Sequence, residues 1–217
     1  MPNWTITHSY IALILMTLIV IFCYVMTLPP EAAYIVTMEG GFVEIASAAG
    51  YFICVAALIF WGRLKYAKRH YYFLILLCAL GFRELDFDKA FTTEGILKSK
   101  FLFADYVPVT EKVLGGLVLL LLSICIVHMI RNHFKAFFIH LFRLREIELA
   151  VGMGFAFIVV SKTIDGIKRK LQFVDITITE HTADVIEYAE EILELGISFL
   201  FLIAISAYFR AQAKVRG

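Results

Sequence analysis

Apolar stretches long enough to cross a membrane run through almost the whole chain. A helix that crosses about 30 Å of hydrocarbon needs roughly 20 mostly apolar residues, and an open strand cannot satisfy its backbone there. Six stretches are predicted as membrane-spanning helices: residues 10–28, 42–61, 71–91, 113–130, 147–164 and 185–209. Because 61% of the residues are hydrophobic and only 18% are charged, an ordinary soluble globule is excluded. The predicted fold is an all-α polytopic integral membrane helical bundle.

The connections between the predicted spans are too short to form further domains. Pro29 and Pro30 end the first span, and the pair Gly40 and Gly41 marks the turn into the second. We therefore expect residues 1–217 to form one transmembrane domain in a cell inner membrane or plasma membrane, with the lipid bilayer as its first partner. The formal net charge of +1 provides no basic excess to hold a nucleic-acid backbone, so nucleic acid is not expected as a partner.

Basic residues gather in loops that lie on one side of this topology. They fall between the second and third spans, between the fourth and fifth, and after the sixth: Arg63, Lys65, Lys68, Arg69, Arg131, Lys135, Arg143, Arg145, Arg210, Lys214 and Arg216. Short loops rich in Lys and Arg stay in the cytoplasm. Both termini are therefore predicted to be cytoplasmic, with the remaining loops facing outward.

Charged residues of the last five spans converge on one depth. Most of them lie roughly 18 to 30 Å above the cytoplasmic ends of their own helices, at 1.5 Å per residue. On the sixth span, Glu187, Glu191 and Glu194 recur at i, i+4 and i+7 and form one stripe. Charges inside a bilayer are costly, so they normally face each other or water. We therefore predict an outward-facing acidic vestibule with these ligand-binding residues: Glu44, Arg83, Glu84, Asp86, Asp88, Lys162, Asp165, Glu187, Glu190, Glu191 and Glu194.

Three functions fit such a vestibule. The first is binding of a cation, proton or small solute for transport or sensing, because hard cations take oxygen ligands and neighbouring carboxylates alter each other's proton affinity. The second is a membrane-embedded metal-dependent hydrolase that acts at the outer leaflet. Its candidate metal ligands are Glu84, Asp88, Asp165, Glu191, Glu194 and His181. The third is a non-catalytic membrane subunit or sensor of a multi-protein stress or defence system.

No catalytic motif favours the enzyme. The sequence contains no His-Glu-x-x-His, no Gly-x-Ser-x-Gly, no Walker loop and no Cys-x-x-Cys. Catalytic residues therefore stay unassigned, and a divalent cation is the one candidate cofactor. Binding for transport or sensing is the leading prediction.

Two segments outside the spans carry patterns of their own. The segment from Thr92 to Lys112 mixes basic and aromatic residues, which predicts either a lid over the vestibule or a re-entry loop. Between the fourth and fifth spans, aromatic and leucine residues repeat at helical spacing: Phe134, Phe137, Phe138, Leu141 and Phe142. This repeat predicts an amphipathic helix on anionic headgroups, with a continuation of the fourth span or a docking surface as the alternatives.

Small residues at helical spacing permit close approach between helices. They include Ala46 with Gly50, Gly115 with Gly116, and Ala150 with Gly154. The pattern predicts tight packing within the chain or a subunit interface. We accordingly expect a homo-oligomer or a complex with a partner membrane protein.

Overall fold

The computed structural model describes residues 5–38, 40–98 and 100–216, with side chains as far as residue 214, so the side chain of Arg216 lies outside the described residues. This part of the chain is helical and contains no strand. The helices are α1 (Ile6–Thr27), α2 (Pro30–Thr37), α3 (Phe42–Arg69), α4 (Tyr71–Glu84), α5 (Phe87–Phe91), α6 (Val109–Phe142), α7 (Glu146–Ile164), α8 (Ile167–Gln172) and α9 (Glu180–Arg216).

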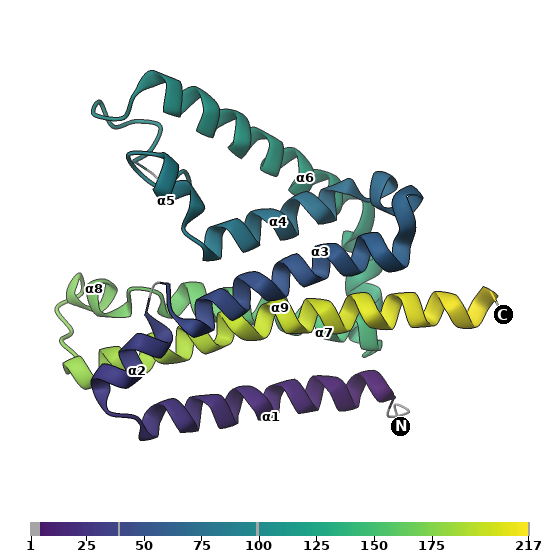
Figure 1. Ribbon diagram of the computed structural model, residues 1–217, viewed down its shortest axis with the longest axis horizontal. Helices are drawn as coiled ribbons and strands as arrows, with labels where there is room; N and C mark the ends of the chain where they lie inside the picture. The colour runs from purple at the N-terminus through teal and green to yellow at the C-terminus, as the bar shows by residue number, and fades with distance from the viewer. Residues whose placement is uncertain (1–4, 39, 99, 217) are drawn as a thin grey trace.

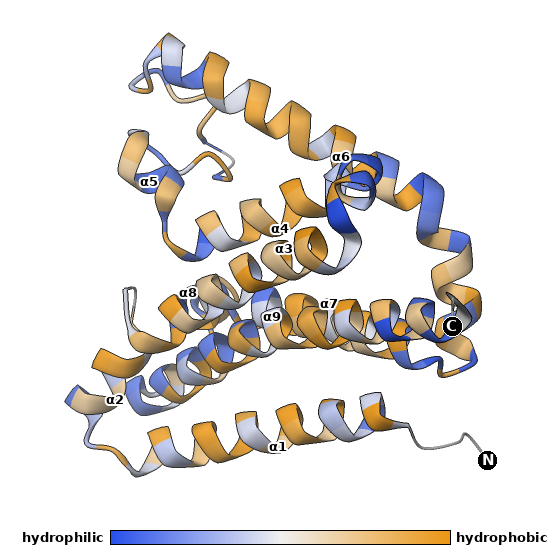
Figure 2. Cartoon of the chain, turned by 45° about the vertical axis from the view of Figure 1, so that its right-hand side comes forward, coloured by the Kyte–Doolittle hydropathy of each residue, from blue (hydrophilic) through white to orange (hydrophobic). Residues whose placement is uncertain are grey.

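Five helical stretches are long and apolar enough to cross a membrane. They are Ile6–Thr27, Pro30–Arg69, Val109–Phe142, Glu146–Ile164 and Glu180–Lys214. Figure 2 shows hydrophobic residues along most of α1, α4 and the first part of α6, whereas hydrophilic residues gather near helix ends and in the connections. The all-helical fold is thus confirmed, and the five apolar stretches suggest a multi-pass membrane protein.

The third predicted span, 71–91, is not one continuous helix. Helix α4 has 14 residues, which corresponds to about 21 Å, and it ends at Glu84. Asp86 then takes a left-handed conformation with φ 48° and begins the five-residue helix α5. Aspartate tolerates that conformation better than most residues do. The charged run after Phe82 therefore contains a break between two helices, where the sequence predicted the last third of one helix.

Helix α9 forms the centre of the bundle. It packs against α7, α3 and α1, and α4 covers α3 on the side away from α9 (Figure 1). Small residues allow two of these contacts, because Gly50 on α3 faces Ser198 on α9, and Gly154 on α7 faces the ring of Phe201. At Gly50 and Gly154, the predicted tight packing between helices of the same chain is therefore confirmed.

The start of α1 and the end of α9 lie at the same end of the bundle (Figure 1). The guanidinium of Arg210 donates a hydrogen bond of 3.3 Å to the hydroxyl of Thr7 and lies over the ring of Tyr10. The connection between α3 and α4 is at this end too. The start of α1 and the end of α9 therefore share the end of the bundle that carries the basic α3–α4 loop.

Helix α6 extends far beyond the predicted span 113–130. Its 34 residues include the aromatic repeat, which is therefore a continuation of the fourth span and not a separate helix. Part of the repeat faces α7: the ring of Phe137 lies 6.2 Å from that of Phe155, and Leu141 packs at Gly152. Phe142 is 83% exposed, so only some of these side chains serve packing within the chain.

Candidate functional site

The carboxylate of Glu194 is the centre of a buried charge cluster. Glu194 is only 5% exposed. The Nη2 atom of Arg83 lies 2.9 and 3.1 Å from its two oxygens, and the Nζ atom of Lys162 lies 3.1 Å from Oε1. The hydroxyl of Ser161 adds a contact of 3.4 Å to the same oxygen. One carboxylate of α9 thus binds cations from both α4 and α7.

The helix ends explain how these side chains meet. Arg83 is in the last turn of α4 and Lys162 is in the last turn of α7. Each long cationic side chain leaves a helix near its C-terminus, where positive charge is favoured by the helix dipole. The hydroxyl of Ser47 on α3 donates to the backbone oxygen of Glu194 at 3.2 Å. Four helices therefore fix the position of this one residue.

Glu84 lies beside Arg83, and one of its carboxylate oxygens lacks a hydrogen-bond donor among the described residues. It is 4% exposed, and its Oε1 atom accepts no hydrogen bond from any residue that the structure describes. The closest cationic nitrogen, Nη1 of Arg83, is 3.9 Å away, beyond hydrogen-bond distance. Buried polar atoms almost always have a partner, so this oxygen is the most unusual atom in the site.

Two further carboxylates of α9 join the group. Glu190 lies 3.6 Å from the ammonium of Lys162, and the half-buried Glu191 lies close enough to Glu194, Glu190, Glu84 and Glu44 to feel their charges. We call Glu84, Glu190, Glu191 and Glu194, together with Arg83 and Lys162, the acidic cluster. With every member ionised it holds four negative and two positive charges. The cluster then carries an excess of two negative charges.

Other predicted site residues lie outside the acidic cluster. Asp86 pairs with Lys89 at 2.7 Å, and a carboxylate oxygen of Asp88 accepts the Ile96 amide at 2.8 Å. At the end of α7, the ammonium of Lys162 lies 3.1 Å from the carboxylate of Asp165. The three others are Glu44, which accepts the Gly40 amide, and Glu187 and His181, which are exposed on α9. The contacts of Asp86, Asp88, Asp165 and Glu44 are thus made at turns and helix ends. The stripe on α9 is divided between core and surface, because Glu194 is buried and Glu187 is exposed.

The six predicted metal ligands are not assembled as a set. Across residues 5–38, 40–98 and 100–216, no group of three or more His, Cys, Asp or Glu side chains is arranged to hold a metal ion. His181 stands at the exposed start of α9, and Asp88 is engaged in the α5–α6 connection. The metal-dependent hydrolase therefore gains no support from this geometry.

The segment between α5 and α6 is ordered by its own contacts. Phe101 is fully buried against Gly115 of α6, and Glu111 accepts hydrogen bonds from the amide and hydroxyl of Thr93. Hydrogen bonds from Lys98 and Tyr106 hold the pKa of the half-buried Glu94 carboxyl below its usual value. These contacts place the segment beside α6 and not over Glu194, so a lid over the acidic cluster is not what the structure has.

Ser47 and Ser161 are the cluster contacts that the sequence reasoning missed. Each had a readable signal: Ser161 precedes Lys162, and Ser47 follows Glu44 by three positions, on the same helix face. A buried hydroxyl on such a face normally has a hydrogen-bond partner.

Comparison with known proteins adds no relative to this description. No protein-family model, no curated protein and no solved structure matches the chain.

Proposed function

We propose that this protein is a multi-pass membrane protein that binds a proton or a small cation at the acidic cluster and uses that binding for transport or sensing. The observation that carries the proposal is the buried Oε1 atom of Glu84, which lacks a hydrogen-bond donor among the described residues. A bound proton or cation supplies the partner that this oxygen lacks.

The charge balance supports the same proposal. Arg83 and Lys162 both contact Glu194, which leaves Glu84 and Glu191 with weak compensation. Removing unpaired charges from water is expensive, and the expense falls when a positive charge or a proton joins the group. Carboxylate oxygens are also the ligands that hard cations prefer. The two basic side chains hold Glu194 in place while the other carboxylates remain available.

The position of the acidic cluster supports access from one side of the membrane. Arg83 and Lys162 stand in the last turns of α4 and α7, far along the helices from the basic α3–α4 loop. The side chain of Lys162 is 40% exposed, so the cluster is not sealed. Under the predicted orientation, a cation or small solute enters from the outside.

The test is the thermal stability of the purified full chain in detergent, measured from about pH 5 to 8, where protein stability tends to be greatest, and with Na⁺, K⁺, Mg²⁺, Ca²⁺ or Zn²⁺ as probes. A bound ion stabilises the folded state by mass action. We expect one ion or a fall in pH to raise the unfolding temperature, and Glu84→Gln to remove that response.

Glu187→Gln is the matched control, because Glu187 is an exposed carboxylate on α9. It should keep the response. A flat response to every ion and to pH in the unmodified protein overturns the proposal. If a response is found, proteoliposomes loaded with a dye for the responding ion then distinguish transport from sensing.

A second candidate function is that of a non-catalytic membrane subunit or sensor in a larger assembly. It is favoured by the way Glu194 joins α4 and α7 to α9, since such a bridge holds helices in register without any ligand. Under this candidate, Glu194→Gln lowers thermal stability equally with and without every ion, and partner proteins co-purify with the chain.

A further inference from the structure

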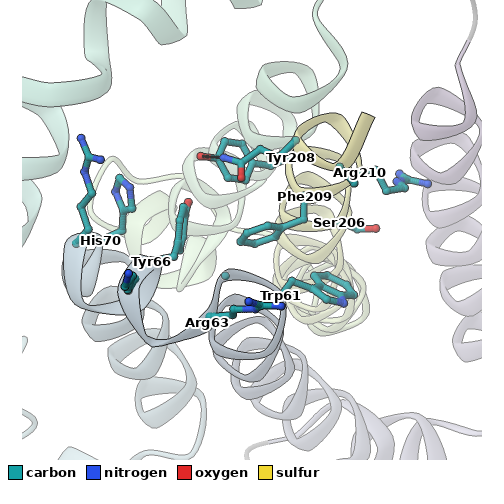
Figure 3. A pocket seen from close by; sticks show the side chains of 13 residues that line it. Trp61, Arg63, Tyr66, His70, Ser206, Tyr208, Phe209 and Arg210 are labelled. Carbon is teal, nitrogen blue, oxygen red and sulfur yellow. Dashed lines mark hydrogen bonds between the residues drawn. The ribbon is translucent and has the colours of Figure 1, made fainter. Parts of the chain in front are cut away.

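A cavity of about 1030 Å³ opens at the opposite end of the bundle from the acidic cluster. It lies between the end of α3 and the end of α9, and Figure 3 shows Tyr66 and His70 on the α3 side and Tyr208 and Phe209 on the α9 side. The aromatic rings pack on one another: the ring centre of Tyr66 lies 5.2 Å from that of Phe209 and 5.8 Å from that of Tyr208. These packed rings form one wall of the cavity, beside the basic loop.

Three cations of this cavity have no hydrogen-bond or ion-pair partner among the residues that the structure describes. Arg63, Lys65 and Arg69 line it, and over the described residues their side chains make no hydrogen bond or ion pair. The lining residues include no Asp or Glu. Arg210 also belongs to the lining but turns toward α1 (Figure 3), where it is bound to Thr7. Counting the described residues alone, the cavity thus presents three unpaired positive charges and no negative one.

The backbone of α3 is bent in the way that forms this cavity. Arg63 has φ 58° and ψ 171°, and it interrupts the helix between its two parts. Residues other than glycine rarely adopt this conformation, because it strains the backbone. Figure 1 shows the end of α3 turning off the bundle axis. Strain of this kind gathers at binding sites, and here it turns the segment that carries Lys65 and Arg69.

An apolar groove adjoins the basic cavity. It has a volume of about 630 Å³ and runs between α3, α9 and α1, with Ile53, Phe60, Leu202 and Ile203 among its lining residues. Trp61 and Ser206 line both the cavity and the groove. Phe60 is 82% exposed, so the groove faces the hydrocarbon. A polar, cationic space therefore opens directly onto an apolar one at the membrane surface.

We propose that this end of the bundle is a binding site for an anionic phospholipid. The phosphate headgroup occupies the basic cavity and is held by Arg63, Lys65 and Arg69, because guanidinium and ammonium groups are the usual partners of phosphate oxygens. An acyl chain lies in the apolar groove between α1, α3 and α9. The wall of Tyr66, Tyr208 and Phe209 sits at headgroup level, where aromatic rings are favoured.

A free phosphate ester offers the same headgroup chemistry, but it leaves the groove empty. The groove is the reason to choose a lipid, since a soluble anion gains nothing from Ile53, Phe60 or Ile203. The site stands apart from the acidic cluster. Its test therefore does not depend on the proposed function.

The experiment is native mass spectrometry of the full chain in a neutral detergent, titrated with phosphatidylglycerol or phosphatidylcholine. We expect preferential binding of phosphatidylglycerol. Each of the variants Lys65→Gln and Arg69→Gln should weaken that binding about tenfold, as expected for one lost charge-assisted contact. Lys68→Gln is the matched control, because it removes a charge from the same turn of α3 at a position that does not line the cavity.

Thermal stability supplies the second readout and confirms that the variants fold. Phosphatidylglycerol should raise the unfolding temperature of the unmodified protein and of Lys68→Gln, and it should have little effect on Lys65→Gln or Arg69→Gln. Equal binding of the two lipids overturns the proposal, as does an equal loss in Lys68→Gln. If soluble glycerol 3-phosphate stabilises the protein as strongly as phosphatidylglycerol does, the lipid is replaced by a free phosphate ester.

Discussion

Arg83 and Glu194 are 111 positions apart in the sequence, and a single guanidinium nitrogen of Arg83 lies 2.9 and 3.1 Å from the two carboxylate oxygens of Glu194. The carboxylate is nearly inaccessible, whereas the side chain of Arg83 is 32% exposed. The contact joins the end of α4 to the middle of α9. Helix α4 packs mainly on α3 and α6, and this pair also ties it directly to the central helix.

Arg83→Gln should destabilise the protein by about 2 kcal/mol, because it removes one of the two cations that compensate a buried carboxylate. Lys162 remains beside Glu194 and keeps the loss below that of a fully unpaired charge. A double-mutant cycle with Glu194→Gln, followed by denaturant unfolding in detergent, measures the pair. We expect the double variant to lose less than the sum of the single losses; strict additivity would contradict the pairing.

The meeting of Arg83, Lys162 and Glu194 at one level of the bundle was predictable from the sequence, but the rotation of each residue about its helix was not. Glu187, Glu191 and Glu194 share one face of α9, yet only Glu194 is buried. The reason is the neighbour: Ser47 of α3 and Ser161 of α7 reach Glu194, while Glu187 stands closer to the exposed start of the helix. Sequence periodicity predicts that the three residues share a helix face. Which helical turn of that face is buried depends on packing partners that are distant in the sequence.

Helix boundaries show the same division. The predicted end of the second span at Trp61 lies two residues before the bend at Arg63, because the apolar run stops there. The predicted continuation from Tyr71 to Phe91 was wrong, since the left-handed residue Asp86 depends on a local conformation that hydropathy does not report. The basic cavity could not be predicted as a site, because the bias of Lys and Arg toward cytoplasmic loops already accounts for its charges.

Gly50 tests the close contact between α3 and α9. A Cβ atom at Gly50 lies 2.2 Å from the Ser198 hydroxyl oxygen, so Gly50→Ala should destabilise the protein by about 1 to 3 kcal/mol through overpacking. Gly116→Ala is the control, because nothing lies within 4 Å of its Cβ position on α6. It should be neutral or stabilising by up to about 1 kcal/mol, as helix propensity predicts.

The compensating change makes the test specific. Ser198→Gly removes the atoms that an alanine at position 50 meets, so the double variant Gly50→Ala with Ser198→Gly should recover much of the lost stability. Thermal unfolding in detergent measures all four proteins. Failure of Ser198→Gly to restore any stability would show that the two helices do not approach each other at these residues.

Arg63→Gly separates backbone strain from charge in the proposed lipid site. Glycine occupies positive φ without the penalty that arginine has there, so the lipid-free variant should be more stable than the unmodified protein, by about 1 kcal/mol. The same variant loses one of the three free cations, so its phosphatidylglycerol binding should weaken. Arg63→Gln keeps the strained backbone and loses the charge. It should weaken binding without the gain in stability.

Glu94 gives the α5–α6 segment a defined response to acid. The Lys98 ammonium and the Tyr106 hydroxyl both bind this carboxylate, at 3.0 and 2.9 Å, and they lower its pKa. A group whose pKa is lower in the folded state stabilises it at pH values above the unfolded pKa, which is about 4.3 for glutamate. That contribution disappears as the pH falls through the lower, folded value.

Hydrogen exchange of the segment, corrected for the pH dependence of the intrinsic rate, measures this effect. Protection of the backbone from residue 94 to 107 should be constant near neutral pH and should decline only at a pH below the usual glutamate pKa. Glu94→Gln should show reduced protection at neutral pH and little further change in acid. Asp105→Asn is the control, since Asp105 is an exposed carboxylate of the same segment and should leave protection unaltered. If Glu94→Gln and Asp105→Asn behave alike, the Glu94 contacts do not hold the segment, and the burial of Phe101 against Gly115 must account for its order.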